Sequence, residues 1–104
     1  MDGTENGVRY QFTVTKPGTT PDLMKVLVAL AIQETDLVFS RARRKLETGF
    51  QFLKANSECT IEGGTECGEH LAKLLSGFLI KQVGEDGFVV RRQYRKSNQA
   101  MGAR

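Results

Sequence analysis

Residues 8–15 (VRYQFTVT) alternate strictly between large apolar and polar side chains, and this pattern constrains the fold more than any other. Val8, Tyr10, Phe12 and Val14 share one phase, and polar residues fill the other. A period of two predicts a strand with one buried and one solvated face, and the β-branched and aromatic residues favour it. The chain must therefore build a sheet as well as any helices it forms.

A helical period follows this strand. Residues 16–21 (KPGTTP) break the strand, and Thr19 or Thr20 is expected to cap a helix whose first turn holds Pro21 and Asp22. From there to about Thr35, apolar side chains recur three and four residues apart, which predicts an amphipathic helix. Its apolar stripe consists of Leu23, Val26, Leu27, Leu30 and Ala31.

The next stretch, residues 36–54, is compatible with two structures. Its apolar residues fit helical spacing, whereas Gly49 and the β-formers around it suit a pair of strands. We expect a second helical or strand segment near residues 37–46 and a strand near residues 49–54.

The second half repeats the change from strand to helix. Residues 57–62 (SECTIE) alternate as a strand, Gly63 and Gly64 end it, and Thr65 is placed to cap a helix. The glycine at position 77 weakens this helix, which either ends there or continues to residue 83. If it ends there, residues 78–83 and 88–94 form a β-hairpin. The apolar stripe of the helix is Cys67, Leu71, Leu74, Leu75 and Phe78.

Together these segments predict one α+β domain over residues 8–96, with flexible ends at residues 1–7 and 97–104. A mixed or antiparallel sheet with two main helices on one face is expected, and the ferredoxin-like split βαβ layout is favoured. The alternative is a winged helix, with residues 71–77 as the groove-reading helix and the hairpin as the wing. The two layouts differ at residues 78–83.

The ends and the longest apolar run indicate a cytoplasmic protein that does not enter a membrane. The start MDGTEN is acidic and precedes no apolar segment of the kind found in secretory signals. Residues 23–32 form the longest apolar run, which includes Lys25 and is far shorter than the about 20 residues that span a bilayer. Two cysteines in this compartment are expected to be reduced thiols.

Both cysteines and the single histidine fall within CTIEGGTECGEH, residues 59–70. The alternative to core packing is a metal site built from Cys59, Cys67 and His70 with a neighbouring carboxylate. Structural zinc sites usually contain closely spaced cysteine pairs, which this segment lacks. Because each cysteine shares the phase of apolar neighbours, we expect two core thiols. No catalytic residue, metal or cofactor is assigned, and an enzyme is not favoured.

Basic residues gather in two clusters, SRARRK at residues 40–45 and VRRQYRK at residues 90–96, although the net charge is only +3. Such clusters favour contact with phosphates, and one tyrosine ring among them is available for base stacking. If the first and last strands are neighbours, Arg9, Gln11, Arg91 and Gln93 share the open face of the sheet. The leading hypothesis is therefore a small non-enzymatic nucleic-acid-binding protein. Its candidate binding residues are Arg41, Arg43, Arg44, Lys45, Arg91, Arg92, Tyr94, Arg95 and Lys96.

Two other interpretations fit the same charges. The chain is also suited to be a protein-interaction or regulatory module that binds an acidic partner, or associates with itself, through a sheet edge or an apolar helix. Alternatively, the arginines are a solvated surface that serves solubility. The aromatic motif of RNA-recognition sheets is absent from the sequence, which removes one specific form of the leading hypothesis.

Overall fold

The computed structural model describes residues 7–20, 22–55 and 57–94. The predicted flexible ends fall outside this part of the chain, apart from Gly7, and so do the candidate binding residues Arg95 and Lys96. In chain order the elements are β1 (Val8–Val14), α1 (Leu23–Phe39), α2 (Arg41–Glu47), β2 (Phe50–Leu53), β3 (Glu58–Glu62), α3 (Glu66–Val83), a short 3₁₀ helix (Glu85–Gly87) and β4 (Phe88–Tyr94).

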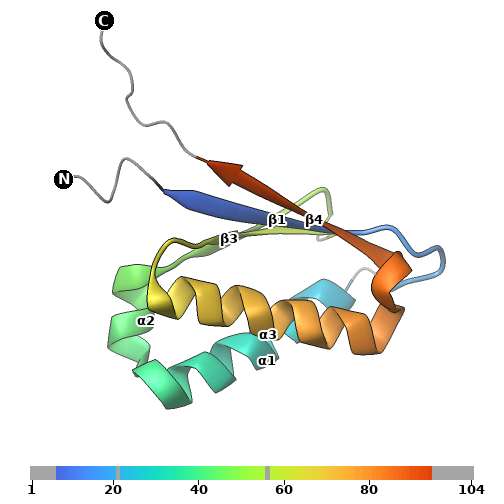
Figure 1. Cartoon of the computed structure of the whole chain (residues 1–104). Coiled ribbons are helices and arrows are strands. Elements are labelled where there is room, and N and C mark those ends of the chain that lie inside the picture. The colour runs from blue at the N-terminus through green and yellow to red at the C-terminus, as the bar shows by residue number, and fades with distance from the viewer. Residues whose placement is uncertain (1–6, 21, 56, 95–104) are drawn as a thin grey trace, which may run out of the picture.

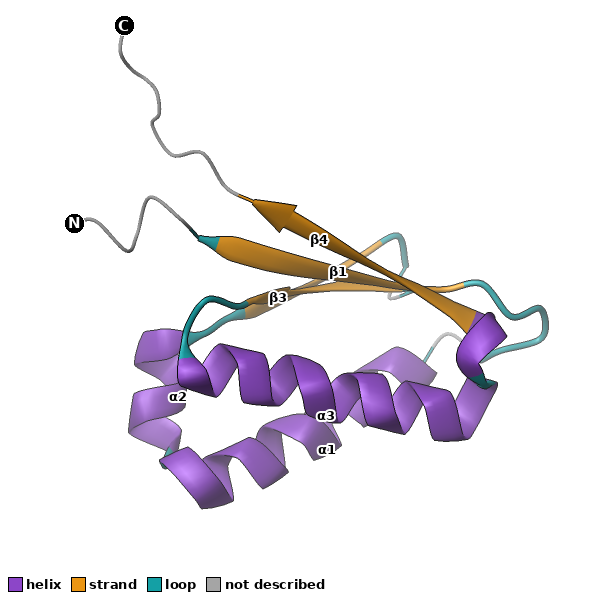
Figure 2. Ribbon diagram, in the orientation of Figure 1, coloured by secondary structure: helices purple, strands orange, loops and turns teal. Residues whose placement is uncertain are grey.

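The strands form one antiparallel sheet in the order β2-β3-β1-β4. β1 and β2 run parallel, α1 and α2 connect them, and β3 is inserted between them. α3 then connects β3 to β4 on the far side of β1, which completes the split βαβ arrangement. Figures 1 and 2 show the helices on one face of the sheet and none on the other. The predicted α+β class and ferredoxin-like layout are confirmed.

Residues 78–83 decide against the winged helix, because they continue α3 and form no strand. The buried side chains of Leu75, Leu79 and Val83 extend the core-facing stripe of the helix past Gly77. The helix ends where Gly84 adopts a φ of +82°, a conformation that glycine accepts without strain. The hairpin alternative for residues 78–94 is therefore wrong, and β4 pairs with β1 instead.

The first helix has different ends from those predicted. Asp22 occupies the N-cap position, and neither Thr19 nor Thr20 does so. At the other end α1 continues to Phe39, with the hydroxyl of the buried Thr35 donating to the Ala31 carbonyl oxygen at 2.8 Å. Ser40, with a φ of +76°, separates α1 from α2. The helical alternative for residues 37–46 is thus correct, and the strand expected near residues 49–54 is β2.

The core lies between the inner face of the sheet and helices α1 and α3. Phe12 and Ile61 occupy the centre of the sheet, and both are fully buried. The helices cover them with Leu27, Val28, Ala31, Leu71, Leu75 and Leu79.

α1 carries more apolar surface than the sheet covers. Met24, Leu27 and Val28 face the core, whereas Val26 and Leu30, placed in the same stripe by their spacing, are exposed by 54% and 44%. The apolar stripe predicted from the spacing is therefore wider than the part of α1 that packs against the core. Among the described residues, no helix is both long enough and apolar enough to cross a membrane.

Two glycines of α3 give a matched test of how this helix meets the sheet. A Cβ atom on Gly68 would lie 2.3 Å from the carbonyl oxygen of Glu62 on β3, whereas one on Gly77 would meet nothing within 4 Å. We expect Gly68→Ala to lower the free energy of unfolding by about 1–3 kcal/mol, because backbone must move. Gly77→Ala should raise it by up to about 1 kcal/mol through helix propensity.

Urea denaturation followed by far-ultraviolet circular dichroism measures both effects. Equal stabilisation by the two alanines would contradict close packing of α3 against the end of β3.

Candidate functional site

The two cysteines are buried core thiols, as their phases predicted. Cys59 and Cys67 are both fully buried and free. Burial raises the pKa of the Cys59 thiol to about 12. Burial, followed by the nearby Glu47 carboxylate, also raises the pKa of Cys67. A neutral thiol is a poor nucleophile and a poor metal ligand, so this environment suits packing better than chemistry.

His70 lies apart from any ligand set. Its ring packs edge-on against Phe39 of α1, with centroids 5.3 Å apart and planes at 71°. Throughout residues 7–20, 22–55 and 57–94, no three His, Cys, Asp or Glu side chains are grouped so that they could hold a metal ion. Cys59, Cys67 and His70 therefore do not converge.

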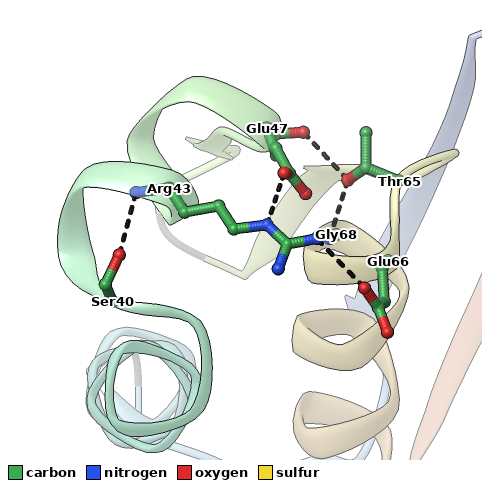
Figure 3. A network of polar contacts seen from close by, with 6 residues as sticks. All are labelled: Ser40, Arg43, Glu47, Thr65, Glu66 and Gly68. Carbon is green, nitrogen blue, oxygen red and sulfur yellow. Dashed lines mark hydrogen bonds and ion pairs between the residues drawn. The ribbon is translucent and has the colours of Figure 1, made fainter.

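In the first basic cluster, Arg43 joins α2 to the start of α3 (Figure 3). Its guanidinium donates to the Glu47 carboxylate and, at 3.0 Å, to that of Glu66. These two hydrogen bonds raise the pKa of Arg43. The same network contains Thr65, whose hydroxyl donates to the Glu47 carbonyl oxygen at 3.0 Å and accepts from the Gly68 amide at 2.9 Å. The side chain of Arg43 therefore links α2 to α3.

Arg44 also forms an ion pair within the fold. Its Nε and Nη2 atoms donate to the two carboxylate oxygens of Asp36 at 2.6 and 3.2 Å, and only 11% of its side chain is exposed. The hydrogen bonds from Arg44 lower the pKa of Asp36, against the opposing effect of burial. Of the four basic residues predicted to bind in this cluster, only Arg41 and Lys45 have no hydrogen-bond or ion-pair partner among the described residues.

In the second cluster, the register of β4 sends neighbouring arginines to opposite faces of the sheet. Arg91 pairs with Gln11 and points to the open face, whereas Arg92 pairs with Tyr10 and points to the helix side. Arg92 lies over the Tyr10 ring, 5.5 Å from its centroid, and makes two long hydrogen bonds to the hydroxyls of Tyr94 and Tyr10, at 3.4 and 3.5 Å. Figure 1 shows α2 at one end of the helical layer and β4 at an edge of the sheet. Arg91 therefore lies on the face of the sheet opposite the helical layer that contains Arg41, Arg43 and Arg44.

The open face of the sheet brings together the four residues predicted to share it. Arg9, Gln11, Arg91 and Gln93 lie on adjoining positions of β1 and β4, and Gln93 donates to Gln11 at 3.1 Å. β3 adds carboxylates to this face: Glu62 accepts from Arg9 at 3.1 Å, and Glu58 accepts from Gln11 at 2.9 Å and pairs with Lys54 at 3.2 Å. The face has mixed charge, and its polar groups largely satisfy one another.

A groove lies on the other side of β4, between this strand and α3. Its volume is about 220 Å³, and its polar lining includes Arg92, Tyr10, Glu69 and Lys73. The Tyr10 hydroxyl lies 2.7 and 2.8 Å from the two oxygens of Glu69, and the Gly64 amide donates to one of them at 3.0 Å. Although burial raises the pKa of Glu69, hydrogen bonds from Gly64 and Tyr10 lower it overall. The carboxylate is half-buried and accepts these hydrogen bonds, whereas the side chains of Arg92 and Lys73 are exposed. Sequence spacing alone did not predict this groove.

Comparison with protein-family models, curated proteins and solved structures finds no match to this chain.

The Arg44–Asp36 pair predicts a pH-dependent contribution to stability. We expect Arg44→Ala to lower the free energy of unfolding by about 1 kcal/mol near neutral pH, because it leaves a partly buried carboxylate without its partner. A lowered pKa in the folded state stabilises above the ordinary value of 3.8 for Asp36. The difference between wild type and variant should therefore shrink as the pH falls through the lower folded pKa.

Denaturation curves at several pH values measure this difference. Arg41→Ala is the matched control, since it removes an arginine of the same helix that has no such partner; an equal loss in both variants would refute the structural role of Arg44.

The cysteines predict slow thiol chemistry. At about pH 8, a thiol with a pKa near 12 is ionised on the order of one part in ten thousand. We expect the native protein to react with a disulfide reagent far more slowly than the urea-unfolded chain, which should release two thiols at once. A fast native phase assigned to Cys67 by mass spectrometry would contradict the burial of that thiol.

Proposed function

We propose that this chain is a small non-enzymatic protein-binding module that adds an extended acidic segment of a partner protein to the free edge of β4. The observation that carries the proposal is an exposed edge strand with an arginine on each of its faces, Arg91 and Arg92.

β4 has the backbone features of a strand receptor. Within the described residues it pairs only with β1, so its other edge presents unpaired amide and carbonyl groups. It is seven residues long, and Val89 and Val90 are exposed by 46% and 42%. The opposite edge strand, β2, has four residues, and such shortness is a common way to protect an edge from pairing. A partner strand therefore finds the longer ladder at β4.

The charge of this edge selects among partners. Two copies of β4 pairing with each other would bring arginines of both chains close together, and like charges on paired strands destabilise a sheet. An acidic segment reverses the sign of this interaction, because Asp and Glu side chains would lie beside Arg91 and Arg92. Backbone pairing supplies affinity in this mode of recognition, and side chains supply specificity.

Nucleic-acid binding, the leading hypothesis from the sequence, has less support from the geometry. Single-stranded RNA bound on a sheet stacks on aromatic rings, but the described strand residues on the open face include none. Glu58 and Glu62 would repel phosphates there, and Arg43 and Arg44 already pair with carboxylates. Among the described residues, Arg91 faces the open side of the sheet and Arg92 faces the helix side, so these two charges do not act on one surface.

Two double charge reversals test the proposal. Arg91→Glu with Arg92→Glu changes the β4 edge, and Arg41→Glu with Lys45→Glu changes the same number of charges on α2. The probes are a blocked threonine-rich strand peptide with three glutamates, its three-lysine counterpart, and single-stranded and duplex oligonucleotides. We expect the glutamate peptide to bind the wild type and the α2 variant, and to lose at least about tenfold in affinity for the β4 variant.

Amide hydrogen exchange identifies the mode of binding. Those β4 amides that point away from β1 should exchange quickly in the free protein and become protected when the peptide binds. Protection elsewhere, or tight oligonucleotide binding that both reversals weaken, would replace this proposal with another surface or with nucleic acid.

A further inference from the structure

The groove between β4 and α3 has two exposed cations and one half-buried carboxylate in its lining. Its cations, Arg92 and Lys73, are exposed and have no carboxylate within ion-pair distance among the described residues. Its one lining carboxylate, Glu69, is half-buried, and although burial raises its pKa, hydrogen bonds from Gly64 and Tyr10 and then the charges of Arg92 and Lys73 lower it. Glu69 accepts from Tyr10 and Gly64, and Lys73 makes no hydrogen bond of its own in this part of the chain.

Arg92 is held in position, yet some of its hydrogen-bond donors remain available. Its guanidinium lies over the Tyr10 ring and makes long hydrogen bonds to two hydroxyls, Tyr10 and Tyr94. Because a guanidinium has five N–H donors, several remain for a ligand. Planar, fork-shaped donors of this kind match a carboxylate, and an ammonium group nearby adds to the attraction.

Strand geometry determines which side chain of a bound segment reaches this groove. On β4, Val90 and Arg92 are two residues apart and point to the helix side, whereas Arg91 points to the open face. In a strand added to β4, every second side chain also points to the helix side. Two such side chains, separated by one residue, would lie beside Val90 and Arg92.

We propose that the groove between β4 and α3 is the specificity pocket for a partner segment with a carboxylate and an aliphatic side chain two residues apart. The carboxylate binds between Arg92 and Lys73, and the aliphatic side chain covers Val90. This proposal rests on the proposed function, because it requires that a strand is added to the edge of β4.

The experiment uses three blocked threonine-rich peptides of about the length of β4. The first has one Glu and one Val two residues apart, the second has Gln in place of Glu, and the third has Glu and Val adjacent, so that they lie on opposite faces. Isothermal titration with the full chain should give the highest affinity for the first peptide, by roughly tenfold over each of the others.

Single substitutions in the protein assign the contact. Arg92→Gln and Lys73→Gln should each remove most of the preference for Glu over Gln, while Arg91→Gln, the control on the other face of the same strand, should leave that preference within about twofold. Arg92→Lys keeps the charge but removes the planar guanidinium, so it should retain only part of the preference for Glu over Gln. Circular dichroism confirms that each variant is folded, which is expected because all three side chains are exposed.

The outcomes separate this proposal from the one it rests on. If peptides protect the outward amides of β4 but Arg92→Gln lowers the affinity for the Glu and Gln peptides equally, the pocket assignment is wrong. Edge pairing then remains supported. If the preference depends on Arg91 instead, the carboxylate binds on the open face. If no peptide protects β4, the proposed function itself fails.

Discussion

The antiparallel pairing of β1 with β4 along all seven residues of each strand is the interaction on which the surface of this protein depends. It places β4 outside β1 and so makes it an edge. It also sends Arg91 and Arg92 to opposite faces, because adjacent residues of a strand alternate. Had residues 78–83 formed a hairpin with β4, as one alternative predicted, the edge would be covered and the groove beside α3 would not exist. Because Leu79 and Val83 continue the buried stripe of α3, residues 78–83 are helical and no described strand pairs with the outer edge of β4.

Much of this architecture follows from periodicity, and the reasons are local. Each of these elements packs against the core through one face, so its apolar residues recur with the period of a strand or a helix. This pattern is visible in the alternation of residues 8–15 and 57–62 and in the helical spacing after Thr65. The grouping of Arg9, Gln11, Arg91 and Gln93 followed once the first and last strands were taken as neighbours. The width of the buried stripe on α1 was not visible. Val26 and Leu30 have the spacing of core residues, yet the orientation of the helix over the sheet leaves them exposed.

The candidate site was harder to predict because it depends on which charges are already neutralised. Arg44 and Asp36 are eight residues apart and meet only because the chain turns at Ser40, with its positive φ. Tyr10 and Glu69 are separated by 59 residues and meet across the sheet and α3. Counting arginines in SRARRK and VRRQYRK treats them as equivalent, whereas tertiary structure uses Arg43 and Arg44 for packing and leaves Arg91 and Arg92 at the surface. Net charge describes solubility and long-range attraction, not the position of a binding site.

In the proposed mode of binding, the charges that attract a partner also protect an exposed edge. Within the described part of the chain, β4 is a long strand with one unpaired edge and two exposed valines. Such an edge favours pairing with other copies of itself, and charged side chains on the edge are a common way to prevent it. Arg91 and Arg92 repel a second β4, but the same repulsion becomes attraction when the approaching strand is acidic. Lys73, which lines the groove from α3, would strengthen this selection in the proposed mode without contributing to the sheet. If the proposal holds, solubility and specificity have one physical cause, and any change that neutralises the β4 arginines should weaken both together.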